Sequence, residues 1–128
     1  MPFRSPDAVL PLTPISFEIL LALLGEDRHG YAILQMVSAR LHGRLPMRTG
    51  TLYRALARLV EEGLISEAAP GKRGAESGSA RQRAELNNER RRYYRITPQG
   101  RRVARAEAER LADQVAAARA HRLIKGRT

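Results

Sequence analysis

The apolar residues of this chain recur with helical spacing in several segments, and polar or glycine-containing stretches separate these segments. Residues 14–24 are almost entirely apolar, and Thr13 and Pro14 are a typical N-cap and first helical residue. Residues 31–41 place their apolar side chains on one face and end before Gly43. The pattern therefore predicts a largely buried helix followed by an amphipathic one.

A third helix is predicted in TGTLYRALARLVEEGLI, residues 49–65, with its end at Gly63. On a helical wheel its apolar residues fall within about 80° of one another. Arg54 and Arg58 lie near the opposite side, and Tyr53 borders the apolar stripe. The segment therefore has a core face and a polar face that carries two arginines in its first turns.

Residues 64–69 and 90–96 are predicted to pair as the two strands of a hairpin. In the second strand, Tyr94 and Ile96 alternate with Tyr93 and Arg95. The intervening residues 70–89 are rich in Gly, Ser, Arg and Glu and have no apolar periodicity. A loop of this length is typical of a functional or flexible segment, so we expect a long, basic and flexible tip on the hairpin.

A last helix is predicted from residue 97 to residue 123, because Thr97 and Pro98 repeat the cap and proline of the first helix. Its apolar positions step by four and three residues, which is a heptad seam. The seam residues are Ala104, Ala108, Leu111, Val115 and Ala118. A helix of 25 residues spans roughly 37 Å, more than a small domain needs for its own core. We therefore expect the seam to face a second copy, and the alternative is an alanine-rich helix that folds back on its own domain.

The element order predicts a mainly α (α+β) fold in a single domain of 128 residues. Three helices followed by a two-stranded wing form a winged helix-turn-helix, and a long C-terminal dimerisation helix follows. The expected organisation is an N-terminal arm, a winged-helix domain, a dimerisation helix and a basic tail, at residues 1–12, 13–96, 97–123 and 124–128.

The charge of the chain is strongly basic and unevenly distributed. Lys and Arg number 23 against 13 Asp and Glu, for a formal net charge of +10. Residues 1–69 carry equal numbers of basic and acidic side chains, so the excess lies entirely in residues 70–128. Only Lys72 and Lys125 are lysines, and arginine suits phosphates and guanine edges. The asymmetry favours a polyanionic partner; a basic surface that only aids solubility is the alternative.

Several classes of protein are disfavoured by what the sequence lacks. The chain has no cysteine, which excludes disulfides and thiolate zinc sites and favours a reducing cytoplasm. It has no apolar run long enough to span a membrane and no apolar core of a signal peptide. His29, His42 and His121 are scattered, and no hydrolase or phosphate-binding motif is present. We expect a cytoplasmic protein that is not an enzyme and holds no metal or cofactor, with His29 as a hydrogen-bonding residue in a turn.

The third helix has the chemistry of a DNA-reading helix. Thr49 and Thr51 are short enough to approach phosphates at a helix N-terminus, and Tyr53 can donate its phenol to a phosphate. Arg54 can donate two hydrogen bonds to a guanine, and Arg58, one turn further, suits a phosphate. The expected contacts of the wing are Lys72, Arg73, Arg91, Tyr93 and Arg95. Each residue also has a plainer interpretation, in which Tyr53 packs against the core and the arginines are solvated surface.

Three segments of the chain resemble the PadR family of transcriptional regulators. They are HGYAI (residues 29–33), GTLYRALARLVEEGLI (residues 50–65) and RRYYRITPQGR (residues 91–101), in the family's order. The resemblance covers roughly residues 12–118. It implies a winged-helix homodimer, usually a repressor, that is held together by its C-terminal helix and binds a pseudo-palindromic operator. The single C-terminal helix is similar to that of the family's shorter subgroup.

The resemblance also concerns the site and its partners. It implies that Tyr53 and its neighbours lie at the DNA backbone and Arg54 near the bases, whereas the wing is longer and richer in Gly and Ser than the family pattern. Some members bind phenolic acids or flat drugs at the dimer interface. This chain has no Trp and only Phe3 and Phe17, which excludes a pocket of stacked tryptophans and leaves a small-molecule effector open. The alternatives are an RNA-binding or non-specific DNA-binding protein, and a dimeric ligand-binding or protein-interaction module that does not read DNA.

Overall fold

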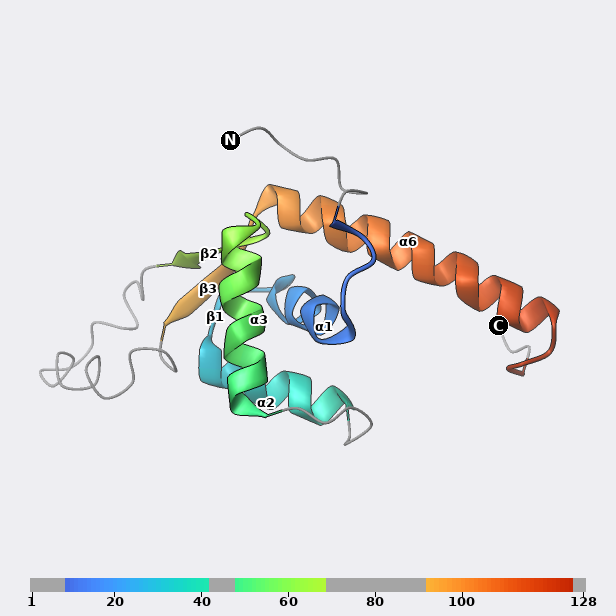
Figure 1. Ribbon diagram of the computed structural model, residues 1–128, viewed down its shortest axis with the longest axis horizontal. Coiled ribbons are helices and arrows are strands. Elements are labelled where there is room, and N and C mark those ends of the chain that lie inside the picture. The colour runs from blue at the N-terminus through green and yellow to red at the C-terminus, as the bar shows by residue number, and fades with distance from the viewer. Residues whose placement is uncertain (1–8, 42–47, 69–91, 126–128) are drawn as a thin grey trace, which may run out of the picture.

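The computed structural model describes residues 9–41, 48–68 and 92–125 of the chain. Their elements are α1 (Pro14–Leu23), β1 (Arg28–His29), α2 (Gly30–Leu41), α3 (Thr49–Glu61), β2 (Ile65–Ala68), β3 (Tyr93–Ile96) and α6 (Pro98–Ala120) (Figure 1). These elements confirm the predicted order of three helices, a hairpin and a long C-terminal helix. The predicted loop at 70–89 lies outside the described residues.

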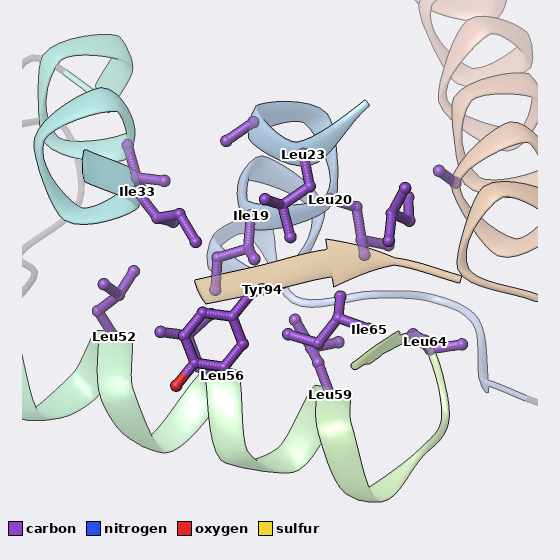
Figure 2. Close-up of a cluster of buried hydrophobic side chains, with 14 of the residues drawn as sticks. Ile19, Leu20, Leu23, Ile33, Leu52, Leu56, Leu59, Leu64, Ile65 and Tyr94 are labelled. Carbon is purple, nitrogen blue, oxygen red and sulfur yellow. The ribbon is translucent and has the colours of Figure 1, made fainter. Parts of the chain in front are cut away.

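The hydrophobic core lies around α1, which packs against α2, α3, α6 and β3. Figure 2 shows side chains of α1, α3 and the sheet converging on one cluster. The apolar stripe predicted for α3 is confirmed, because Leu52, Leu56 and Leu59 are almost fully buried. Burying a side chain of this type stabilises the fold by about 1.5 to 3 kcal/mol. The core therefore holds one face of α3 and leaves its polar face outside.

The helix starts follow the predicted capping chemistry at both Thr-Pro sequences. The hydroxyl oxygen of Thr13 accepts a hydrogen bond of 3.1 Å from the backbone N–H of Ser16. The hydroxyl oxygen of Thr97 accepts one of 2.9 Å from the backbone N–H of Gly100. In both helices, proline occupies the first position, where no N–H is needed.

The sheet has three antiparallel strands in the order β1-β3-β2, whereas the sequence predicted two. The wing strands β2 and β3 pair as expected, with Ile65 opposite Ile96. The additional strand β1 was predicted as part of a turn, and its two residues pair with β3, Arg28 opposite Tyr94. A two-residue strand has no alternation to detect, and its pairing depends on a partner far away in the chain. Tyr94 and Ile96, which the alternation places on one face of the strand, are both buried in the core.

The ends of α3 and α6 are both closed by a residue with positive φ. After α3, Gly63 has a φ of 78°, and the backbone N–H of Leu64 donates to the carbonyl oxygen of Leu59 at 3.0 Å. After α6, Arg122 has a φ of 64°. The predicted end of the last helix at residue 123 was therefore too late. No glycine or proline marks the true end, so the sequence carried no stop signal there.

The first half of α6 belongs to the core of its own domain. Val103 and Ala104 are 0% and 5% exposed, and Glu107 is 2% exposed. Glu107 forms an ion pair of 2.8 Å with Arg110. Hydrogen bonding from Arg110 lowers the pKa of Glu107 against the opposing effect of burial, and a backbone hydrogen bond from Leu12 lowers it further. The contact with Leu12 connects the segment before α1 to helix α6. The end of the predicted N-terminal arm therefore packs on the core.

The second half of α6 extends past the other described elements (Figure 1). Ala108 and Val115 are exposed, and Leu111 and Ala118 are half-buried. The structure therefore contradicts a helix that folds back along its whole length. One predicted seam residue needs a correction, because Ala104 is covered within its own protomer. The other four seam residues remain a prediction for the dimer interface. None of the described helices is long and apolar enough to cross a membrane.

Candidate nucleic-acid interface

The polar face of α3 carries the residues that were expected to read DNA. Thr49, Arg54 and Arg58 are exposed, and Thr51 is half-buried. The helix runs along the surface, with its first turn beside α2 and its last turn beside the start of α6 (Figure 1). Its opposite face is fixed in the core, so the polar face has a defined direction.

The side chain of Arg54 folds back toward the start of α3. Its Nη1 atom lies 3.4 Å from the position that a Cβ atom would take on Gly50. Helical side chains lean toward the N-terminus, and the absence of a side chain at Gly50 leaves room for the guanidinium group. The structure therefore places the charge of Arg54 in the first turn, where a helix entering the major groove contacts base edges.

Arg48 is a candidate that the sequence interpretation missed. It is the N-cap residue of α3 and is exposed, but its side chain does not cap the helix. The first turn of α3 contains no acidic residue. A cation at a helix N-terminus is unfavourable unless an anion approaches, because the helix dipole is already positive there. The position of an arginine immediately before a predicted recognition helix was the available signal.

Tyr53 occupies a different position from the one expected. The residue is half-buried and packs against the core, and its hydroxyl oxygen is inaccessible to solvent. A phosphate would have to reach this oxygen through the protein surface. The position favours the plainer interpretation of Tyr53 as a packing residue, because a tyrosine at the border of an apolar stripe can turn toward the core.

The base of the wing is tied to the rest of the domain. The guanidinium group of Arg95 donates to Asp27 through Nε at 3.1 Å and Nη2 at 2.9 Å. Hydrogen bonding to Asp27 raises the pKa of Arg95. The ring of Tyr93 meets the ring of His29 edge to face, with centroids 5.6 Å apart. Both wing residues have partners within the protein that position them, and their DNA contacts remain a prediction.

His29 itself connects the sheet to the helix-turn-helix. Its Nδ1 atom accepts a hydrogen bond of 3.1 Å from the backbone N–H of Ala32, in the first turn of α2. The expected hydrogen-bonding role is confirmed, although His29 lies in β1 and not in a turn. The remaining predicted wing contacts, Lys72, Arg73 and Arg91, lie outside the described residues.

Ion pairing separates the arginines of α3 from the others in the winged-helix domain. Within the described part of residues 13–96, every arginine outside α3 and its N-cap residue pairs with a carboxylate. These arginines are Arg28, Arg40, Arg92 and Arg95, whose partners are Glu26, Glu18, Glu67 and Asp27. The arginines of α3 and its cap, Arg48, Arg54 and Arg58, form no ion pair with a described carboxylate. Their positive charge is therefore directed to the outside.

The fold and this cationic helix define a winged-helix DNA-binding regulator. A comparison with family models identifies the family: residues 19–106 match the transcriptional regulator PadR-like family. The chain belongs to this family. It is therefore a DNA-binding transcriptional regulator and not an enzyme, as the sequence predicted.

Solved structures support the same fold. A transcriptional regulator from Clostridium thermocellum is 26% identical, with a TM-score of 0.58 over 88% of this chain and 94% of that chain. A PadR family transcription regulator from Clostridium difficile R20291 is 21% identical, with a TM-score of 0.62 over 85% and 98%. The protein smu.1704 from Streptococcus mutans UA159 is 22% identical, with a TM-score of 0.59 over 99% and 97%. A search of curated proteins gave no match.

Proposed function

We propose that this regulator is a cytoplasmic, sequence-specific repressor that binds a pseudo-palindromic operator as a homodimer. The observation that carries the proposal is the set of three arginines that form no ion pair with a described carboxylate, Arg48, Arg54 and Arg58, at the start and on the polar face of α3. A protein that did not bind a polyanion would gain from pairing these charges, as it pairs its other described arginines in the same domain.

The three arginines have different expected roles. The guanidinium group of Arg54 reaches back to the first turn, so we assign it to a guanine edge, which it can bind with two hydrogen bonds. Arg48 lies before the helix and Arg58 one turn beyond Arg54, and we assign both to phosphates on either side. Glu61 and Glu62 close the helix and would be repelled by DNA. The charge distribution therefore favours entry of α3 with its N-terminus first.

The second half of α6 supports a homodimer. Leu111, Val115 and Ala118 follow the heptad spacing on a part of α6 that extends beyond its own domain. Leu123, which follows the helix, is 77% exposed. A second copy would cover these apolar residues and place two α3 helices symmetrically, as a two-fold operator requires. Occupation of such an operator is the basis of the proposed repression, and a small-molecule effector that changes the dimer is the proposed route of release.

Arg54→Ala should weaken binding to the operator by about 1 to 3 kcal/mol and relax the preference at one base pair in each half-site. Arg58→Ala should weaken binding to all sequences alike, because a phosphate contact carries no sequence information. Fluorescence anisotropy with the operator and a set of single-base variants measures both effects.

The matched control for Arg54 is Arg119→Ala, which removes the same charge from an exposed position near the end of α6. This variant should retain the specificity of the wild type. Equal losses for Arg54→Ala on every sequence would reduce Arg54 to a phosphate contact. An unchanged affinity would remove Arg54 from the contacts, and a wild type that prefers no sequence would favour the alternative, a winged-helix module that does not read DNA.

A further inference from the structure

Thr97 joins the start of α6 to the residues that follow α3 through two hydrogen bonds, and a third hydrogen bond caps α6. Its backbone N–H donates to the carbonyl oxygen of Leu64 at 3.0 Å. Its hydroxyl group donates to the carbonyl oxygen of Gly63 at 2.6 Å and accepts from the backbone N–H of Gly100 at 2.9 Å. The side chain of Thr97 thus caps α6 and binds Gly63, and its backbone binds Leu64. We call these four residues the α3–α6 junction.

Gly100 brings the first turn of α6 into direct contact with the backbone that follows α3. A Cβ atom at this position would collide with the carbonyl oxygen of Leu64 and would lie 2.8 Å from Cγ1 of Ile96. The first turn of α6 therefore rests on the backbone that leaves α3, with no flexible side chain between them. Such a contact fixes distance and direction more firmly than packing of long side chains.

On its other side, the junction continues into the last turn of α3. The backbone N–H groups of Gly63 and Leu64 donate to the carbonyl oxygens of Val60 and Leu59, each at 3.0 Å. A continuous set of hydrogen bonds therefore runs from α3 through Gly63 and Leu64 to α6. Because hydrogen bonds are directional, this set restrains the angle between the two helices.

A second connection between α3 and α6 passes through α1, which packs against both helices. The buried residues that α1 supplies to the core, such as Ile19, Leu20 and Leu23, are apolar. Apolar packing holds helices together but permits small sliding and rotation of one helix on another. The two connections therefore make different predictions when the hydroxyl group of Thr97 is removed.

We propose that Thr97 is a positioning residue that sets the angle between the DNA-reading helix α3 and the dimerisation helix α6. The inference rests on the proposed function for its consequence, since this angle sets the separation of the two α3 helices in a two-fold dimer. The half-site spacing of the operator mirrors that separation. Thr97 thus contributes to the choice of operator without contacting DNA.

Three substitutions at Thr97 separate the hydroxyl tether from helix capping. Thr97→Val keeps the shape but loses both hydroxyl hydrogen bonds. Thr97→Asp keeps an N-cap acceptor for Gly100, yet a carboxylate cannot donate to Gly63. Thr97→Ser keeps the hydroxyl group and is the conservative rescue. If the hydrogen bond from the Thr97 hydroxyl group to Gly63 sets the helix angle, Thr97→Val and Thr97→Asp should change this angle alike. Thr97→Ser should keep the angle of the wild type.

The first readout is operator binding as a function of half-site spacing. Each added base pair turns one half-site by about 34 to 36° and moves it by about 3.4 Å. The wild type and Thr97→Ser should bind one spacing at least tenfold more tightly than its neighbours. Thr97→Val and Thr97→Asp should bind neighbouring spacings within about threefold, with base preferences inside each half-site unchanged. In binding free energy, a tenfold difference in affinity corresponds to roughly 1.4 kcal/mol and a threefold difference to roughly 0.7 kcal/mol.

The second readout needs no DNA. The chain has no cysteine, so Ala57→Cys on α3 and Ala112→Cys on α6, both exposed, can carry a pair of spin labels. Double electron–electron resonance on labelled protein diluted with unlabelled protein reports the distance distribution between the helices. This distribution should be narrow in the wild type and Thr97→Ser and broader in Thr97→Val and Thr97→Asp.

The outcomes separate the two proposals. If the wild type binds no DNA specifically, the proposed function fails, while the distance distributions still test the junction. Unchanged distributions in both Val and Asp variants would overturn the inference and assign the helix angle to the packing of α1 and the pairing of β2 with β3. A broadened distribution in Thr97→Val alone would assign the effect to capping of α6 and would also overturn it. Thr97→Asp, which retains the cap, provides the test even if Thr97→Val fails to fold.

Discussion

Replacing Leu111 and Val115 together with aspartate should convert the protein to monomers. Both residues lie on the apolar seam of α6, and in the proposed dimer each would be covered by the second copy. A carboxylate buried there without a partner is strongly unfavourable, and two-fold symmetry places four such charges in one interface. Because a monomer engages one half-site at a time, operator affinity should fall by roughly 10² to 10⁴.

Sedimentation equilibrium measures the first effect, and binding to an intact operator and to a single half-site measures the second. The matched control is the pair Ala116→Asp and Ala120→Asp, which adds the same charges, also four residues apart, to exposed positions on the side of α6 away from the seam. This control should remain dimeric. A dimer that persists in the Leu111 and Val115 variant would place the interface elsewhere on the chain.

Raising the salt concentration from 50 to 200 mM should weaken operator binding by about 10³ to 10⁵ if the dimer contacts six to ten phosphates. The physical reason is the release of counterions from DNA by cationic side chains. The chain supplies a net charge of +10, and the arginines of α3 are directed outward. The dependence of affinity on salt therefore counts the phosphate contacts.

Single substitutions locate those contacts. Arg48→Ala should reduce the slope of log affinity against log salt by about 0.9 for each phosphate lost, and Arg119→Ala should leave the slope unchanged. Titrations by fluorescence anisotropy at four or more salt concentrations give the slopes. An affinity that does not change with salt would contradict an electrostatic contact of α3 with DNA.

The helix starts and the buried face of α3 were predicted well because they depend on residues close together in the sequence. Thr13 and Thr97 mark the helix starts because a hydroxyl group caps the N–H group three residues later, which is a local interaction. The buried face of α3 follows from the helical period, since Leu52, Leu56 and Leu59 recur at that spacing. Such signals were sufficient for the winged-helix order and for the direction of the polar face of α3.

The features that the sequence missed depend on contacts between distant parts of the chain. Strand β1 exists because Arg28 lies opposite Tyr94 in the sheet. Arg95 turned out to pair with Asp27, which is 68 residues away, so its charge could not be assigned to a partner from the pattern alone. The inward hydroxyl group of Tyr53 likewise depends on the packing of α3 against the sheet. At the candidate DNA-binding site, the helical wheel predicted which side chains of α3 are exposed. It could not predict which arginines form ion pairs.

The central claim is that two copies of this chain read a two-fold symmetric DNA sequence. Selection of binding sites from a random pool of double-stranded DNA tests it most directly, because no operator has to be known beforehand. We expect enrichment of two inverted half-sites with centres about one helical turn apart, roughly 34 to 36 Å. Enrichment of a single asymmetric site, or no enrichment over the starting pool, would contradict it.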